Sequence, residues 1–341
     1  MARVLITGGA GFVGRHFARH FLERGDDVVV VDSLVDSGGG LDPALGWPLF
    51  EPRDFDGFRF RRSDCRSWFA EHAHLEVDLA LHLAAVVGGR RVLESEPLAV
   101  AVDLSIDAAY WEWARSARPV KTVCFSSSAA YPVRLQQEET SALLSEDLVD
   151  LSGQRDIGMP DMSYGWSKLT CEYLARLARA RHGLASVCYR PFSGYGEDQD
   201  DAYPFPSICR RAIEGRASGR VAVWGSGRQM RDFIHVEDCV RAVTTTMGAI
   251  DDGGAVNLST GVLTSFRELA RLAAEVVGYD AVVEALTDEP EGVFARGGDT
   301  DKQRRLGFVP RVSLRSGVEQ MIDYLTQASR SGARRHRYEV A

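Results

Sequence analysis

The feature that most constrains the fold is an ordered series of short patterns at the start of the chain. An apolar run at 4–6, rich in β-branched residues, predicts a buried parallel strand. A glycine-rich turn and a helical pattern follow it, and a second apolar run at 28–31 ends in Asp32. The turn contains Gly8, Gly9, Gly11 and Gly14. Strand, glycine turn, helix, strand and acid in this order predict a dinucleotide-binding unit.

Each part of this unit has a physical role in binding a dinucleotide. Glycines let backbone amides approach a pyrophosphate, and the helix N-terminus adds a partial positive charge. Asp32 can accept hydrogen bonds from an adenosine ribose, and its charge would repel a 2′-phosphate. No arginine directly follows Asp32. The sequence therefore predicts NAD, rather than NADP, as the cofactor.

Further apolar runs recur at the spacing of a parallel α/β fold. Strands are expected at 79–83, 122–125 and 186–189, with helical patterns near 101–117 and 164–181. The expected fold class is α/β, a Rossmann-type doubly wound parallel sheet with a smaller C-terminal α/β substrate domain. The expected boundaries are 1–189 for the NAD-binding domain, with a later returning strand near 232–237, 190–330 for the substrate domain, and 331–341 for a tail.

One helix of the second domain can be placed from its ends. Ser265 followed by Glu268 is a capping-box pattern, and the apolar residues that come next recur at helical spacing. Gly278 is expected to close the helix. This element is expected to be structural.

Composition excludes several classes of protein. A net charge of −8 argues against a general nucleic-acid binder, and the basic run at 334–337 is expected to be a solvated tail. No apolar stretch is long enough to cross a membrane, and the N-terminus opens into a strand rather than a signal peptide. The six cysteines show no C-x-x-C spacing and no histidine at metal-ligand distance, so no metal site is expected. The expected location is the cytoplasm.

A tyrosine and a lysine carry the clearest catalytic pattern. The chain has three lysines, and Lys168 stands four residues after Tyr164 within an expected helix. Positions i and i+4 share a helix face, so the two polar groups can converge on one point. An ammonium beside a phenol favours the phenolate and lowers its pKa, which suits tyrosine to accept a proton.

These motifs together resemble the extended short-chain dehydrogenase/reductase family, specifically its nucleotide-sugar epimerases and dehydratases. The resemblance covers residues 3–325. It is carried by the glycine turn at 7–14, Asp32, Asp64, the segment 82–85, the serine run 126–128 with Tyr131, Tyr164 and Lys168, the segment 190–196, and the segment 231–238.

The resemblance implies roles for individual residues. It implies an NAD site made of Gly8, Gly11, Phe12, Val13, Gly14, Asp32, Asp64, Leu83, Ala84, Ala85, Tyr164 and Lys168. Tyr164 is implied as the catalytic base, with Lys168 holding the nicotinamide ribose. A catalytic serine is also implied: counting back from Tyr131 gives Ser127, which we favour, and counting from the strand gives Ser128.

The substrate implied by the resemblance is a nucleotide sugar, in which the sugar is linked to GDP, UDP or ADP. It would contact Gly88, Ser127, Ser128, Ser193, Arg231 and Arg296. Arginine suits a diphosphate because its planar fork makes bidentate contacts with phosphate oxygens. The family also implies a homodimer, formed through helices such as 101–117 and 164–181.

The residues after the serine separate the reactions of the family. Dehydratases usually carry acids where this chain has Ser128 and Ala129, and members acting on GDP-sugars carry a cysteine where it has Ala129. What remains is 4-epimerisation of a nucleotide-linked hexose or heptose through a transient 4-keto sugar, which we favour. The alternatives are a 3- or 5-epimerase of a GDP-mannose-like sugar using Glu197 or Asp198, a 4,6-dehydratase or 4-reductase, and a non-catalytic NAD-binding sensor.

Overall fold

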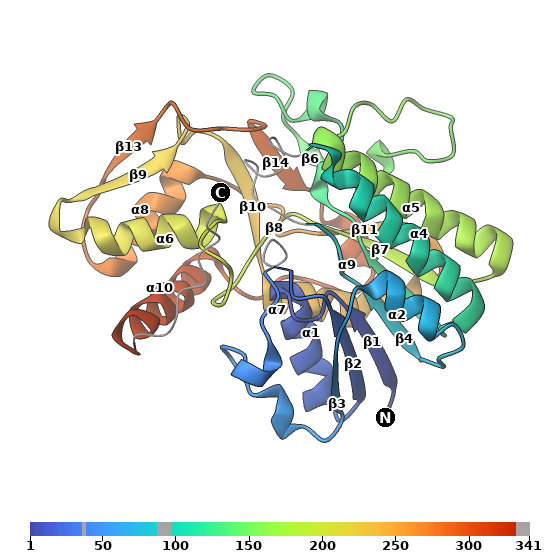
Figure 1. The fold of residues 1–341 in the computed structure, drawn as a ribbon. Helices are drawn as coiled ribbons and strands as arrows, with labels where there is room; N and C mark the ends of the chain where they lie inside the picture. Colours follow the sequence, from blue (N-terminus) through green and yellow to red (C-terminus); the bar gives the residue numbers. More distant parts are fainter. Residues whose placement is uncertain (36–38, 87–96, 332–341) are drawn as a thin grey trace.

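A seven-stranded parallel sheet forms the centre of the molecule (Figure 1). The computed structural model describes residues 1–35, 39–86 and 97–331. The strand order is β11-β7-β5-β4-β1-β2-β3. In chain order these strands are β1 (Arg3–Thr7), β2 (Asp27–Asp32), β3 (Phe58–Arg62), β4 (Leu79–His82), β5 (Lys121–Phe125), β7 (Ser186–Pro191) and β11 (Asp252–Leu258). The α/β class and the doubly wound sheet expected from the sequence are confirmed.

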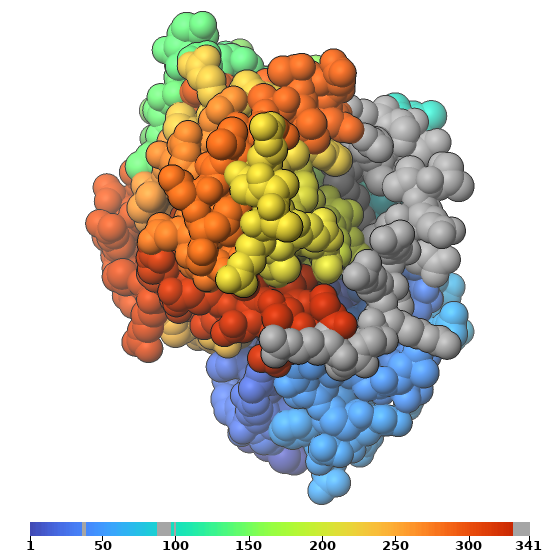
Figure 2. All heavy atoms as spheres, turned by 90° about the vertical axis from the view of Figure 1, so that its left-hand side faces the viewer, coloured from blue at the N-terminus to red at the C-terminus, as the bar shows by residue number. Residues whose placement is uncertain are grey.

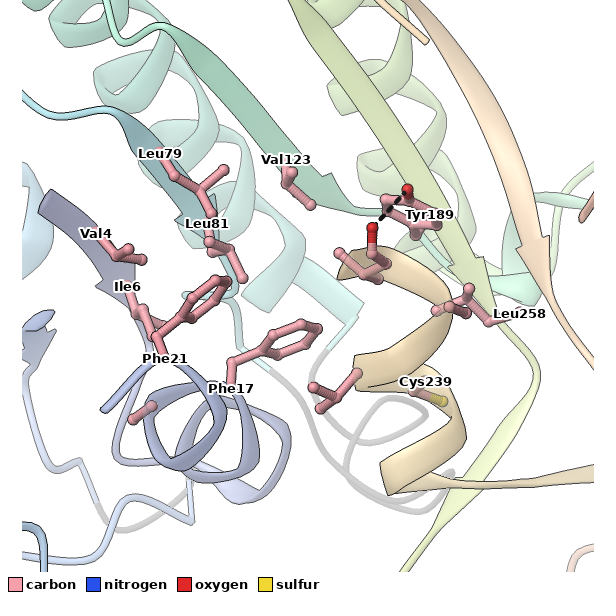
Figure 3. Packing of buried hydrophobic residues seen from close by; sticks show 14 of the residues in the cluster. Val4, Ile6, Phe17, Phe21, Leu79, Leu81, Val123, Tyr189, Cys239 and Leu258 are labelled. Carbon is pink, nitrogen blue, oxygen red and sulfur yellow. Dashed lines mark hydrogen bonds between the residues drawn. The ribbon is translucent and has the colours of Figure 1, made fainter. Parts of the chain in front are cut away.

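Helices cover both faces of this sheet. On one face lie α1 (Phe12–Glu23) and α7 (Val236–Thr246), whose apolar side chains pack against alternate strand residues such as Val4 and Ile6 (Figure 3). The other face carries α2 (Cys65–Glu71), α4 (Val100–Ala117) and α5 (Met162–His182). A strand covered on both faces needs apolar residues at every position, which explains the unbroken apolar runs of the sequence.

The last strand of the large sheet comes from far along the chain. It is β11, which pairs with β7. The sequence prediction placed this returning strand near 232–237, and that is wrong, because residues 230–235 form β10 (Met230–His235) of a second sheet. Strand β10 is followed directly by a helix, α7, as strands of a doubly wound sheet often are, so the sequence pattern did not show which sheet the strand joins. The NAD-binding half therefore includes α7 and β11 as well as the first part of the chain.

The second lobe is built around three helices and two small sheets. The helices α6 (Pro204–Glu214), α8 (Phe266–Val277) and α10 (Leu314–Ser331) share one apolar cluster, and Figure 2 shows them packed together in yellow, orange and red. The predicted capping box of Ser265 and Glu268 is present, and Gly278 closes α8 in the left-handed conformation. The remaining elements are β6 (Leu143–Leu144), β8 (Ser193–Tyr195), β9 (Arg220–Trp224), β12 (Leu263–Ser265), β13 (Val282–Leu286), β14 (Ala295–Gly298) and α9 (Asp301–Arg305).

Two predictions from composition can be compared with the structure. All six cysteines are buried and unbridged, as expected for small apolar side chains. Among the described residues, no helix combines the length and apolar character needed to cross a bilayer. The basic run at 334–337 lies outside the described residues.

Candidate active site

The glycine turn between β1 and α1 leaves no room for side chains. Gly8 has a φ of 67°, in the left-handed region that favours glycine, and a Cβ there would lie 2.7 Å from the Ala84 nitrogen. A Cβ on Gly14 would lie 2.5 Å from the Gly8 carbonyl oxygen. Within the described residues α1 has no side-chain cap at Gly11, so amides of its first turn remain available to an anion. This cradle fits the pyrophosphate of NAD.

The two acids predicted to bind the adenosine half have different surroundings. The Asp32 carboxylate accepts the amides of Ala10 (3.0 Å) and Leu34 (2.9 Å), which orient it. Burial raises the pKa of Asp32, and those two hydrogen bonds oppose the shift. Asp64 caps α2 and pairs with Arg66, which lowers the pKa of Asp64. Asp32 can still accept hydrogen bonds from a ribose, whereas Asp64 could contact adenine only while it is also paired with Arg66.

Segment 83–85 leaves the carboxyl end of β4 beside the glycine turn. Strand β4 is the direct neighbour of β1, with His82 opposite Thr7. The side chains of Leu83, Ala84 and Ala85 are half-buried. Their place at the edge of the sheet next to the turn agrees with a cofactor contact, and that role stays a prediction. Gly88, which was predicted to contact substrate, lies outside the described residues.

The structure brings Tyr164, Lys168 and Ser127 together. The Lys168 ammonium lies 5.4 Å from the centre of the Tyr164 ring, and Ser127 lies close enough to Tyr164 to lower the pKa of its phenol. Burial raises the pKa of Tyr164, whereas Lys168 and Ser127 lower it, and the net shift is upward. Lys168 therefore lowers the pKa of Tyr164, as the sequence predicted, but burial raises that pKa by more. Of the two candidate serines, Ser127 is the one that meets the tyrosine.

A close approach of α5 to the serine turn explains this geometry. A Cβ on Gly165 would lie 2.4 Å from the Ala129 carbonyl oxygen, so only glycine allows the helix to pack so tightly here. The same carbonyl accepts the amide of Asp161 (2.9 Å) at the start of the helix. Met162 has a φ of 60°, a strained backbone conformation for a non-glycine residue. Strain and tight packing at this point fix where Tyr164 stands relative to Ser127.

A buried ion pair lies next to the turn that carries Ser127. Arg190, at the end of β7, donates from Nε and Nη2 to the two Glu172 oxygens, at 2.8 and 2.7 Å. Glu172 also accepts the hydroxyl of Ser126, the neighbour of Ser127. The sequence analysis missed this pair, although Glu172 stands four residues after Lys168 on the same helix.

The two arginines expected to bind a diphosphate are direct partners on neighbouring strands. Arg231 of β10 lies opposite Arg296 of β14 in a parallel register, which puts both on one face of the sheet. Arg231 donates to the Val293 carbonyl (3.0 Å), and Arg296 donates to Gln136 and Asp161, both at 2.6 Å. Arg296 is thus already paired with Asp161, and an incoming diphosphate would have to share it. Their contact with substrate stays a prediction.

The other predicted substrate residues occupy two separate positions. Ser128 is buried in the short 3₁₀ turn that follows Ser127. Ser193 is half-buried on β8, which pairs with β10 opposite Phe233.

Glu197 and Asp198, the two acids suggested for proton transfer at carbon, have different surroundings. Asp198 is held by Arg15 (2.6 Å) and His16 (2.8 Å) of α1, and although burial opposes it these partners lower the pKa of Asp198 to about 2. Such a carboxylate is a poor proton carrier, so the structure argues against Asp198. Glu197 is more open and faces His235 at 3.5 Å, a contact that lowers the pKa of Glu197. Glu197 remains the stronger of the two candidates.

A large surface hollow lies elsewhere. It has a volume of about 1360 Å³ and is lined by the segment 145–155, the C-terminal half of α5, the start of β11, and α9. Arg176, which lines it, follows Tyr164 by twelve residues, or about 18 Å along the helix. Its lining mixes acids and bases, and neither Tyr164 nor Lys168 lines it.

Comparison with known proteins agrees with this site. The chain matches the NAD dependent epimerase/dehydratase family over residues 4–259. It belongs to this family. The match confirms the resemblance that the sequence motifs indicated, and NAD is the cofactor of the family.

Relatives within the family carry out different reactions. GDP-L-fucose synthase 1 of Arabidopsis thaliana is 27% identical, covering 95% of this chain and 93% of its own. The dTDP-glucose 4,6-dehydratase of Escherichia coli is 24% identical, covering 94% and 92%. The solved structure of Thermus thermophilus UDP-glucose 4-epimerase with NAD has a TM-score of 0.77 at 24% identity, covering 96% and 99%. The likeness to this solved structure shows the fold of the present chain.

Proposed function

We propose that this chain is an NAD-dependent nucleotide-sugar 4-epimerase. The observation that carries the proposal is the meeting of Tyr164, Lys168 and Ser127 beside a turn that offers no acid or cysteine. The two residues after Ser128 are the buried Ala129 and Ala130. The site therefore has the groups for moving a hydroxyl proton, and the residues that directly follow the serine in the chain, 128–130, supply no acid that could eliminate water.

The residues would act on one hydroxyl of the sugar. NAD, when bound, supplies the acceptor and then the donor of a hydride. The Tyr164 phenolate would take the C4 hydroxyl proton and later return it, while the Ser127 hydroxyl would hydrogen-bond the same oxygen. Lys168 would hold a positive charge beside Tyr164, and Arg231 and Arg296 would bind the diphosphate. Epimerisation follows when the 4-keto sugar receives its hydride on the opposite face.

The second candidate is epimerisation at C3 or C5 of a GDP-linked sugar. It is favoured by the relative named a GDP-L-fucose synthase, which aligns over 95% of this chain. This chemistry needs an acid and a base aimed at carbon. Glu197 beside His235 is the described acid that could serve, whereas Asp198 is already neutralised.

Proton NMR of the purified protein with UDP-, GDP-, ADP- and dTDP-sugars in heavy water tests both candidates. A new C4 epimer without deuterium at carbon is the expected result. Deuterium at C3 or C5 would refute 4-epimerisation and support the second candidate. The Tyr164→Phe variant is expected to bind NAD and to show no turnover; turnover in that variant would refute the proposed proton path. An NAD-binding protein that transforms no sugar in any arm would be a non-catalytic sensor.

We also propose that the chain forms a homodimer through α4 and α5, which pack side by side. Trp166 and Tyr173, seven residues apart on α5, are 44% and 48% exposed, and Val102 of α4 is 38% exposed. Apolar side chains this open on adjacent helices are typical of an interface. Light scattering of the Trp166→Glu variant should show a monomer where the unaltered protein gives a dimer.

A further inference from the structure

Arg296 of the second lobe is bonded to the start of the helix that carries Tyr164. It stands on β14, and its Nη2 donates to the Asp161 carboxylate at 2.6 Å. The two side chains are 14% and 11% exposed, so this ion pair is largely withdrawn from water. Asp161 is the N-cap residue of α5, three positions before Tyr164. An arginine predicted to bind a diphosphate is therefore held against the start of α5.

The backbone of Asp161 joins the start of α5 to the 3₁₀ turn that follows Ser127. Its amide donates to the Ala129 carbonyl (2.9 Å) in that turn, and its carbonyl accepts the Gly165 amide (3.0 Å) in the first turn of α5. In the described helix, the Asp161 side chain caps no amide of α5, and its carboxylate lies on Arg296 instead. A movement of Asp161 would therefore be felt on both sides of the catalytic site.

Gln136 gives Arg296 a second connection, to the other end of the serine turn. Arg296 Nε donates to Gln136 Oε1 at 2.6 Å. The Gln136 amide group donates in turn to the carbonyls of Tyr131 (3.1 Å) and Pro132 (3.2 Å), where the turn ends. Gln136 is fully buried, so its polar atoms need these partners. One guanidinium is thus bonded to the start of α5 and, through Gln136, to the end of the serine turn.

Binding of a diphosphate would change this junction. A guanidinium makes bidentate contacts with phosphate oxygens, and Arg231 stands opposite Arg296 on the neighbouring strand. A phosphate at Arg296 must compete with Asp161, because both are anions that accept from the same donors. A ligand shifts a conformational equilibrium only by binding its two states with different affinity, and release of Asp161 supplies that difference. The released carboxylate could then cap amides of α5, the usual role of aspartate at this position.

We propose that Arg296 connects the diphosphate site with the start of α5, and that Asp161 and Gln136 are the positioning residues through which it acts. In the unliganded protein, Asp161 holds Arg296 and opposes diphosphate binding. When the nucleotide is bound, Gln136 keeps Nε in place while the rest of the guanidinium moves to the phosphate. Asp161 then completes the start of α5, which places Tyr164 for the reaction. The inference rests on the proposed function in that Arg296 is taken to bind the diphosphate.

The test is the Asp161→Asn variant, which keeps an N-cap side chain of the same shape and removes the charge. Binding of UDP, GDP, ADP and dTDP is measured by calorimetry with NAD present, and the tightest of them serves as the probe. Its Kd should be about three- to fivefold lower for the variant, the size expected when one ion pair no longer competes. With a nucleotide sugar that the unaltered protein converts, the turnover number should fall at least about tenfold. A merely structural role would weaken binding and turnover together.

The matched control is Glu138→Gln. Glu138 pairs with Arg228, and this ion pair also joins the segment after the serine turn to the second lobe. Its removal should change neither the Kd nor the turnover number. Circular dichroism checks that each variant folds. If Asp161→Asn does not fold, Asp161→Ser, which also caps a helix and carries no charge, serves in its place with the same expected results.

A folded Asp161→Asn protein whose Kd is unchanged or higher would overturn the inference, and so would an unchanged turnover number. Failure of the proposed function looks different. If Arg296→Met leaves the Kd unchanged, the diphosphate does not bind at Arg296, and the inference falls with that part of the proposal. If Arg296→Met raises the Kd but no nucleotide sugar is converted, 4-epimerisation fails, and the Kd of Asp161→Asn alone decides the inference.

Discussion

Replacing Glu172 by glutamine should destabilise the protein by an amount that can be worked out from its surroundings. Glu172 and Arg190 are 1% and 0% exposed and are joined by two hydrogen bonds. The variant keeps the shape of the side chain but leaves the guanidinium buried without a counter-charge, which costs about 3–5 kcal/mol. With an unfolding entropy of about 2.1 cal/mol/K per residue, the 341 residues give about 0.7 kcal/mol/K. The melting temperature should therefore fall by about 4–7 °C.

The assay is thermal unfolding followed by circular dichroism, with two comparison variants. Glu23→Gln removes an exposed partner of Arg19, 52% exposed, and should change the melting temperature by less than about 2 °C. The double variant Glu172→Gln with Arg190→Met removes the orphaned charge and should recover much of the loss. A Glu172→Gln protein that melts within about 1 °C of the unaltered chain would refute the view that this pair is desolvated.

Three further outcomes are expected. Gly14→Ala places a Cβ 2.5 Å from the Gly8 oxygen and should weaken NAD binding, measured by calorimetry, at least about tenfold. The control Gly248→Ala, whose Cβ would have no atom within 4 Å, should leave NAD affinity unchanged. Equal affinity in both variants would refute the role of the glycine turn in binding NAD. Asp198 has a pKa lowered to about 2, so its stabilising effect is complete above its ordinary pKa and is lost as pH falls towards 2. The free energy of unfolding in urea should therefore change less between pH 4 and 2 for Asp198→Asn than for the unaltered protein. An equal change in both proteins would contradict the ion pair. Arg231→Met should raise the Kd for a nucleotide sugar at least about tenfold with NAD affinity unchanged, and an unchanged Kd would remove this arginine from the site.

The parts of the fold that the sequence predicted are those whose cause is local. The central strands β1, β2 and β4 are largely unbroken apolar runs, and the glycine turn needs backbone freedom at fixed positions, so both are visible in the chain itself. The return of β11 to the large sheet was misplaced because strand partnership depends on tertiary packing, which the pattern of a short strand does not show.

The candidate site shows the same division. Tyr164 and Lys168 share a helix face and could be paired by spacing alone. Ser127 was favoured over Ser128 by counting back from Tyr131, but the packing of Gly165 on Ala129, which brings α5 against the serine turn, could not be read from the sequence. Asp103 and Asp107 of α4 are 2% and 3% exposed and were missed, although two acids at i and i+4 within an apolar helix are an available signal of buried polar groups. The restraint on Asp198 by α1 could not be found from the sequence, since it joins residues 182 and 183 positions apart.

The late arrival of β11 has a consequence for synthesis of the chain on the ribosome. Until residues 252–258 emerge, β7 pairs with β5 on one side only, and its other edge presents unpaired backbone groups. Sixty residues, 192–251, separate β7 from its missing neighbour, and most of them belong to the second lobe. The nascent chain must therefore carry an open sheet edge while part of the second lobe is being made, and during that interval it is most exposed to pairing with a neighbouring chain.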